Sequence, residues 1–83
     1  MTKELMAVEG GGKGPVYLRF SERTIARTES YAGGELNVDV DDCNEVVGIE
    51  MLATEPEEIA ALASVAQTYD LHLGRLFSVR KVG

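Results

Sequence analysis

The chain has 83 residues, of which 45% are hydrophobic, a net charge of −6 and one cysteine. This length permits a single domain with a thin core, and no apolar run approaches the roughly 18 residues of a membrane span. One cysteine excludes an internal disulfide, and together with the absence of a signal-like segment it indicates the reducing cytoplasm. A core this small also favours a homodimer that buries one further apolar face.

Residues 1–14 are predicted to form a flexible arm ahead of one domain that spans residues 15–83. Four of the five residues from Gly10 to Gly14 are glycine, and no helical or strand period runs through the arm. These glycines do not form a phosphate-binding loop, because Lys13 is followed by Gly14 and Pro15 instead of a hydroxyl residue and a helix.

Four strands are predicted over residues 16–20, 24–30, 36–40 and 46–52, separated by turns at residues 21–23, 32–34 and 41–44. Apolar and polar residues alternate in the first and third strands. Glycine in the second turn and Asn44 in the third supply left-handed conformations. Each strand is expected to pair with the next one, which gives a four-stranded antiparallel meander.

The register of this meander is predicted from the requirement that one face be apolar. Val38 is placed opposite Ile49, Leu36 opposite Met51 and Val40 opposite Val47. The same rule pairs Ala26 with Val40, Thr28 with Val38, Leu18 with Ala26 and Val16 with Thr28. The resulting apolar face comprises Val16, Leu18, Phe20, Ala26, Thr28, Leu36, Val38, Val40, Val47, Ile49 and Met51.

The opposite face of the predicted sheet is polar. In this register Arg27 falls opposite Asp39, a cross-strand ion pair worth about 0.2–1 kcal/mol. Gly48 lies in the middle of the last strand, where glycine indicates either a bulge or close approach of another group over Asp39. The polar face comprises Tyr17, Arg19, Arg27, Glu29, Asn37, Asp39, Asp41 and Glu50.

A helix is predicted to cover the apolar face. Residues 54–57, Thr-Glu-Pro-Glu, form a capping box with proline at the second helical position. An apolar stripe follows at helical spacing, and the helix ends near residues 69–70. The tail, residues 71–83, admits either further helical turns over residues 71–77 or a strand over residues 76–82. The predicted fold is therefore α+β. The stripe comprises Ile59, Leu62, Ala63, Ala66 and Tyr69.

The chain shows no catalytic constellation and no metal site of a usual kind. Cys43 and His72 are the only residues of their types, so a zinc site cannot be built in the usual way. Cys43 lies in an acidic turn, where negative charge disfavours the thiolate that a nucleophile needs. The C-terminal basic residues with Phe77 are thin support for RNA binding in an acidic molecule. No enzyme activity and no cofactor are expected.

Acidic residues dominate the middle of the chain. Nine of them and no basic residue lie between Glu35 and Glu58. This charge disfavours nucleic acid and favours a protein partner with a basic surface, or self-association, in a non-enzymatic accessory domain. The alternative is a small-molecule or metal-binding regulator, or a weak hydrolase, using the carboxylates of Asp39, Asp41 and Glu50. The predicted interaction surface comprises Asp39, Asp41, Asp42, Glu45 and Glu50.

Residues 16–52 resemble domain-of-unknown-function family 2283. The likeness rests on Val-Tyr-Leu-Arg-Phe at 16–20, Val-Asp-Val-Asp at 38–41 and, most specifically, Val-Val-Gly-Ile-Glu-Met-Leu at 46–52. Two features depart from the family pattern: Glu9 and glycines replace an acidic Tyr-Asp-type segment, and residues 43–44 replace an Asp-Gly turn. The resemblance implies a small bacterial protein with an antiparallel sheet, from a family with no established activity.

Overall fold

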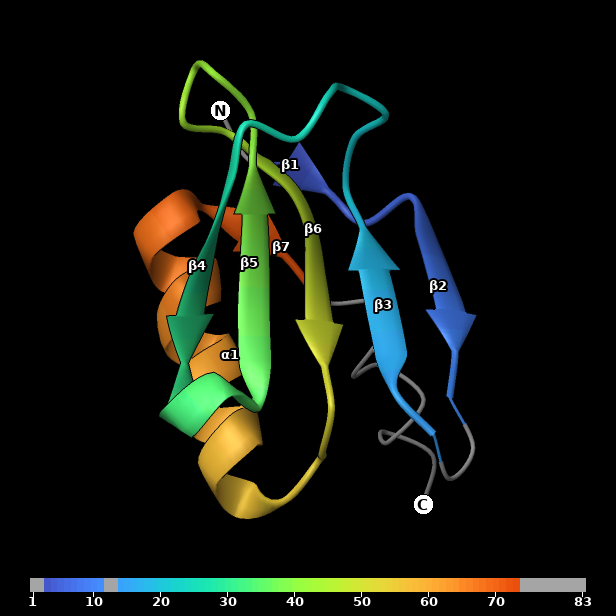
Figure 1. Cartoon of the computed structure of the whole chain (residues 1–83), viewed down its shortest axis with the longest axis vertical. Helices are drawn as coiled ribbons and strands as arrows, with labels where there is room; N and C mark the ends of the chain where they lie inside the picture. The colour runs from blue at the N-terminus through green and yellow to red at the C-terminus, as the bar shows by residue number, and fades with distance from the viewer. Residues whose placement is uncertain (1–2, 12–13, 74–83) are drawn as a thin grey trace.

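A computed structural model describes residues 3–11 and 14–73 of the chain. Its main element is a five-stranded antiparallel sheet in the order β2-β3-β6-β5-β4, with helix α1 packed against one face and a separate parallel pair β1-β7 (Figure 1). The predicted α+β class is confirmed, with five strands in place of four. The elements are β1 (Lys3–Glu4), β2 (Ala7–Gly10), β3 (Val16–Arg19), β4 (Arg27–Tyr31), the 3-10 turn η1 (Ala32–Gly34), β5 (Leu36–Val40), β6 (Val46–Met51), α1 (Pro56–Tyr69) and β7 (Leu71–His72).

The N-terminal segment, expected to lack regular structure, contains two strands. β2 forms an antiparallel hairpin with β3, in which the Gly11 N–H donates to the Pro15 carbonyl at 3.0 Å. Gly10 and Gly11 adopt φ angles of 80° and 114°, so these glycines form a tight turn where flexibility was expected. Leu5 is buried in the core. Residues 7–10 thus form a strand that the sequence pattern did not predict, because backbone pairing with β3 leaves no period in the side chains.

The predicted meander order is also wrong. β3 pairs with β6, while β4 lies at the far edge beside β5. Five of the six β6 residues are buried, a pattern that requires neighbours on both sides. A meander would have left β6 at an edge. Residues 20–26 therefore cross the end of the sheet, past the tops of β5 and β6 in Figure 1, to reach β4.

The predicted register of β5 against β6 is confirmed over most of its length. Val38 lies opposite Ile49 and Leu36 lies opposite Met51. The register shifts between Asp39 and Val40, so that Val40 faces Val46 instead of Val47. The extra β6 residue forms a bulge, as the mid-strand glycine next to it indicated.

The register of β4 differs from the prediction by one residue. Glu29 lies opposite Val38, a position predicted for Thr28. Ala26 and Thr28 are consequently exposed and do not belong to the core. The predicted Arg27–Asp39 cross-strand pair is wrong for the same reason, because Thr28 takes the place opposite Asp39. A strand this polar carries no apolar alternation that would fix its register.

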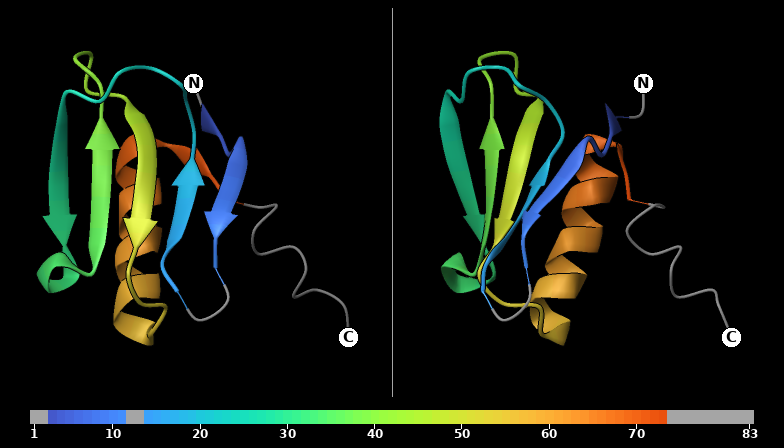
Figure 2. Two further views of the ribbon diagram at one scale, coloured as in Figure 1. Left: turned by 45° about the vertical axis from the view of Figure 1, so that its right-hand side comes forward. Right: turned by 90° about the vertical axis from the view of Figure 1, so that its right-hand side faces the viewer.

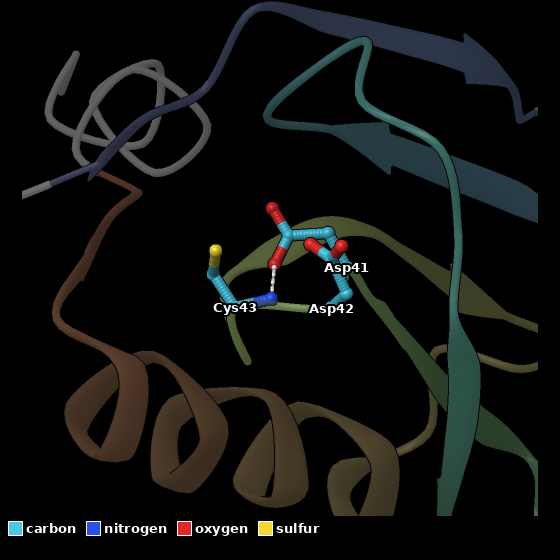
Figure 3. Close-up of side chains that lie close together, drawn as sticks. All are labelled: Asp41, Asp42 and Cys43. Atoms are coloured by element: carbon cyan, nitrogen blue, oxygen red, sulfur yellow. Dashed lines mark hydrogen bonds between the residues drawn. The ribbon is translucent and has the colours of Figure 1, made fainter.

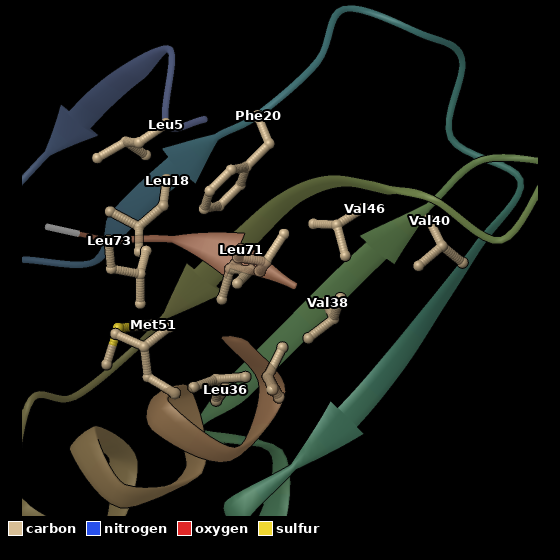
Figure 4. Packing of buried hydrophobic residues seen from close by; sticks show 13 residues of the cluster. Leu5, Leu18, Phe20, Leu36, Val38, Val40, Val46, Met51, Leu71 and Leu73 are labelled. Carbon is tan, nitrogen blue, oxygen red and sulfur yellow. The ribbon is translucent and has the colours of Figure 1, made fainter. Parts of the chain in front are cut away.

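The core lies between the sheet and α1, and Figure 4 shows its side chains converging from both layers. The opposite face of the sheet, here called the outer face, has no covering element among the described residues (Figure 2). No helix in the described ranges is long and apolar enough to cross a membrane. The core cluster comprises Leu5, Leu18, Phe20, Leu36, Val38, Val40, Val46, Ile49, Met51, Leu62, Val65, Leu71 and Leu73.

Helix α1 begins at Pro56, one residue later than predicted, so proline occupies the first helical position and not the second. Glu55 is the N-cap, and its N–H donates to the Glu58 carboxylate at 3.1 Å, so the capping box joins these two residues. The predicted end is confirmed, since Asp70 adopts the left-handed conformation that terminates the helix.

The buried stripe of α1 is rotated from the predicted one. Leu62 is buried as expected, but Val65 and Glu58 join it while Ile59 and Ala63 are exposed. After the helix, β7 pairs with β1, so a helical continuation through residues 71–72 is wrong. The alternative strand over residues 76–82 lies outside the described residues.

Gly48 provides the space for an aromatic side chain on the outer face. A Cβ atom at this position would overlap the Tyr17 ring, and the Tyr17 hydroxyl reaches across to donate to Asp39 at 2.8 Å. The prediction of a close approach over Asp39 is therefore confirmed, and Tyr17 is the residue that makes it.

Gly48→Ala should lower the free energy of unfolding by roughly 1–3 kcal/mol, because the methyl group must displace the packed Tyr17 ring. In a Tyr17→Ala background the space is vacant, so the same change should cost less, with a coupling of at least about 0.5 kcal/mol. Urea denaturation of the four proteins measures this coupling. Equal costs in both backgrounds would show that the ring does not set the requirement for glycine.

Candidate functional site

The predicted interaction residues separate into two groups in the structure. Asp39 and Glu50 lie on the outer face, where Glu50 is opposite both Tyr17 and Asn37. The other three, Asp41, Asp42 and Glu45, lie at the β5–β6 turn, at one end of the sheet. The carboxylates of Asp39, Asp41 and Glu50 are not brought together as a possible metal-binding group within the described residues.

Asp39 belongs to a polar chain that crosses the outer face. Its carboxylate accepts hydrogen bonds from the Tyr17 hydroxyl at 2.8 Å and the Thr28 hydroxyl at 2.6 Å. The Arg19 guanidinium lies 5.2 Å from the centre of the Tyr17 ring and pairs with Glu9 at 2.9 Å. The chain thus joins β2 to β4 across the intervening strands, and its contacts account for both oxygens of Asp39.

The environment of Tyr17 in this polar chain of side chains raises the pKa of its hydroxyl. Burial, and next the hydrogen bond to Asp39, raise the pKa of the Tyr17 hydroxyl above its ordinary value of 10.0. A phenol held in this state stays protonated at neutral pH and donates to the carboxylate. The arrangement therefore fixes side chains across the sheet and offers no general base.

Asp41 organises the β5–β6 turn from inside it. Its side chain is buried, with a residue exposure of 1%, and one oxygen accepts from the Cys43 N–H at 2.8 Å (Figure 3). The same oxygen accepts from the Glu45 N–H at 2.9 Å. The other oxygen pairs with Arg23 at 2.8 Å. The backbone N–H of Glu45 is the main cause that lowers the pKa of Asp41. Asn44 takes the left-handed conformation predicted for it, with φ of 65°.

Asp41, Asp42 and Cys43 form a possible metal-ligating group, with ligand atoms within 4.8 Å of one another (Figure 3). The Arg23 guanidinium already lies against the carboxylates of Asp41 and Asp42 and would oppose a cation there. Two carboxylates with one thiol also match neither an oxygen site for a hard cation nor a nitrogen–sulfur site for zinc. The group is explained by the turn, and we assign no metal to it.

His72 is not placed to complete such a site. Its Nδ1 atom lies 2.9 Å from the Glu4 carboxylate, between β7 and β1. Both side chains are largely exposed, so the contact contributes little to stability. His72 therefore forms a contact between the paired strands β1 and β7.

A cluster that the sequence pattern did not indicate joins β4 to the end of α1. The Glu29 carboxylate accepts from the hydroxyls of Tyr69 at 2.7 Å and Tyr31 at 3.0 Å, and from Arg27 at 2.8 Å. Forty positions separate Glu29 from Tyr69, and Glu29 was predicted on the opposite face. Only the one-residue difference in register brings these groups together.

The Glu29 cluster also lacks a group suited to proton transfer at neutral pH. The hydrogen bond from Tyr69, followed by those from Arg27 and Tyr31, lowers the pKa of Glu29. In turn, the Glu29 carboxylate is the main cause that raises the pKa of Tyr69 to about 12. The carboxylate stays ionised and the phenol stays protonated, so their hydrogen bond holds the edge strand β4 against helix α1.

The distribution of unpaired charge is uneven. Every Lys and Arg within the described residues has a carboxylate partner: Lys3 with Glu45, Arg19 with Glu9, Arg23 with Asp41 and Asp42, and Arg27 with Glu29. Four carboxylates form no ion pair and no side-chain hydrogen bond in that part of the chain: Glu22, Glu35, Glu50 and Glu57. Glu22 lies in the β3–β4 connection, whereas Glu35 directly precedes β5, Glu50 lies near the end of β6 and Glu57 lies in the first turn of α1. The start of β5, the end of β6 and the start of α1 all lie toward one end of the molecule (Figure 1).

Comparison with known proteins supports the resemblance seen in the sequence. The family model described as protein of unknown function (DUF2283) matches residues 16–54. The matched segment runs from β3 through β6 and includes both Gly48 and the Asp41 turn. No curated protein sequence and no solved structure gives a significant match. The family description supports no particular activity.

Asp41→Asn should lower the thermal denaturation midpoint clearly more than Asp42→Asn does. The first change weakens acceptance from two backbone N–H groups and removes the ion pair with Arg23, while the second alters an exposed side chain. Differential scanning fluorimetry of the two variants provides the measurement. Equal midpoints would contradict the assignment of Asp41 as the residue that organises the turn.

Stability should fall in acid partly through Glu29. Its folded pKa lies below the ordinary value of 4.5, so its contribution is present above that value and is lost as pH falls through the folded pKa. Glu29→Gln should lower the midpoint at neutral pH and flatten the profile below about pH 4.5, measured by thermal denaturation down to about pH 3. The matched control is Glu22→Gln, which should leave both features unchanged.

Proposed function

We propose that this chain is a non-enzymatic accessory domain that binds a protein partner with a basic surface. The observation that supports it is the grouping of Glu35, Glu50 and Glu57 toward one end of the molecule with no cationic partner among the described residues. We call this region the acidic end. Acidic side chains that no internal cation neutralises are available to a partner's lysine and arginine side chains.

The acidic end combines charge with apolar surface. Leu52 is 46% exposed, and its N–H donates to the Glu35 carbonyl at 2.8 Å, so these two residues are neighbours. Ile59, in the first turns of α1, is also exposed. Protein interfaces commonly have an apolar centre with a charged rim. A partner segment with basic residues flanking an apolar side chain suits this composition.

The turn end of the predicted surface is less suitable. Asp42 and Glu45 are exposed, but Arg23 and Lys3 already lie against them. A partner would have to displace these cations, and Asp41 is enclosed by the turn. Of the residues predicted from the sequence, Glu50 is therefore retained in the proposed surface and the other four are not.

The proposal contains no catalytic step and no cofactor. The polar groups that could carry chemistry, around Asp39, Asp41 and Glu29, are held in hydrogen bonds that stabilise the fold. The exposed, free thiol of Cys43 is compatible with the reducing cytoplasm that we expect for this protein.

Charge reversal at the acidic end tests this proposal. Tagged protein is incubated with its native extract at low and moderate salt, and a stoichiometric partner that dissociates as salt rises is then titrated in purified form. Glu35→Lys and Glu50→Lys should each weaken binding by roughly tenfold, or about 1.4 kcal/mol, because each removes an attraction and adds a repulsion.

Glu22→Lys is the matched control, since it changes the net charge equally at a site outside the acidic end. It should bind the partner nearly as well as the wild-type protein. If all three variants lose affinity alike, only overall charge matters and the proposed surface is wrong. If none loses affinity, the partner binds elsewhere.

A further inference from the structure

Strand β2 forms an edge of the sheet that no other strand of the described residues pairs with on its outer side. All four of its residues are exposed, and within the described residues only β3 pairs with it. Val8 is 47% exposed, although its register partner Leu18 is buried in the core. Met6, which leads into the strand, is 53% exposed. The apolar layer of the sheet therefore continues to this edge without a cover in the described part of the chain.

The backbone of β2 has hydrogen-bonding groups directed away from the sheet. The Gly11 N–H donates to the Pro15 carbonyl, and Glu9 lies opposite Tyr17 two positions further along the hairpin. Successive residues of a strand direct their backbone groups to alternate sides. Glu9 thus faces β3, and the N–H and C=O of Val8 face outward, where another strand can pair with them.

The other edge strand, β4, is protected against such pairing. Arg27 and Glu29 place charges along it, and the Glu29 contacts with Tyr69 fix it to the helix. Charged residues on an edge disfavour edge-to-edge association. On β2 the single charge, Glu9, is paired with Arg19 on its own sheet. The two edges therefore differ, and β2 is the one suited to pairing.

We propose that β2 pairs antiparallel with β2 of a second copy of this chain, with Val8 at the twofold axis. In that register Val8 lies opposite Val8 of the second copy, and Ala7 lies opposite its Glu9, so no like charges are opposed. Each Val8 offers one donor and one acceptor to the other, and the two apolar side chains cover one another. Because β2 uses the same surface on both copies, the assembly closes as a dimer and does not extend into a fibre.

The salt dependence of this dimer separates it from binding at the acidic end. Each copy carries a net charge of −6, so the two copies repel one another at long range. Salt screens this repulsion, and the dimer should tighten as salt rises. A basic partner should dissociate under the same change. The two proposals can therefore fail independently.

Sedimentation equilibrium of the full-length protein over a concentration series, at low and moderate salt, is the first test. A monomer–dimer equilibrium that shifts toward dimer with salt is expected. Val8→Lys should raise the dissociation constant at least about tenfold, because it places two cations at the axis. Ile25→Lys is the matched control, since Ile25 is equally exposed at 47% but lies away from β2, and it should leave the dimer intact.

Crosslinking tests the register itself. In a hydrogen-bonded antiparallel pair the Cα atoms lie about 5.5 Å apart, within the range for a disulfide. Val8→Cys combined with Cys43→Ser should form a covalent dimer on mild oxidation, whereas Ile25→Cys with Cys43→Ser should not. A wild-type protein that stays monomeric at every concentration, or a dimer that Val8→Lys leaves unchanged, would overturn the proposal.

Discussion

The burial of β6 is the constraint on which the rest of the fold depends. This strand is apolar at nearly every position, so it needs a neighbour on each edge and cover over its faces. β3 and β5 supply the edges, and α1 covers one face of the sheet. On the outer face β6 is covered by the Tyr17 ring, which can lie against the strand because Gly48 has no side chain. The crossing connection between β3 and β4 follows from placing β6 inside the sheet.

The carboxylates show how an acidic sequence is used in this fold. Asp41, Asp39 and Glu29 lie in different parts of the structure, and each accepts hydrogen bonds from groups distant in sequence or from a turn backbone. A carboxylate removed from water needs such donors, and each of these three carboxylates has its own separate set of donors. Within the described residues, these three carboxylates therefore act as separate hydrogen-bond acceptors that hold the fold together.

Two surfaces have groups that these structural roles do not use, and we propose both as binding surfaces. The acidic end offers unneutralised charge with exposed Leu52, and the β2 edge offers backbone groups with exposed Val8. They use different physical interactions, one electrostatic and one based on strand pairing. In a dimer joined through β2, each copy would contribute its own acidic end, so a partner with two basic segments would gain affinity through effective concentration.

The sequence by itself determined the α+β class, the central β5–β6 register, the end of the helix and the close approach over Gly48. These features follow from local signals: the alternation of apolar and polar residues, the end of the helical apolar stripe at Tyr69, and a glycine in an otherwise apolar strand. Tertiary structure alone decided that β3 joins β6, that β4 shifts by one residue, and that residues 7–10 form a strand. Polar edge strands bury too little to encode a partner in their side chains, so their pairing depends on backbone groups and distant residues such as Tyr69.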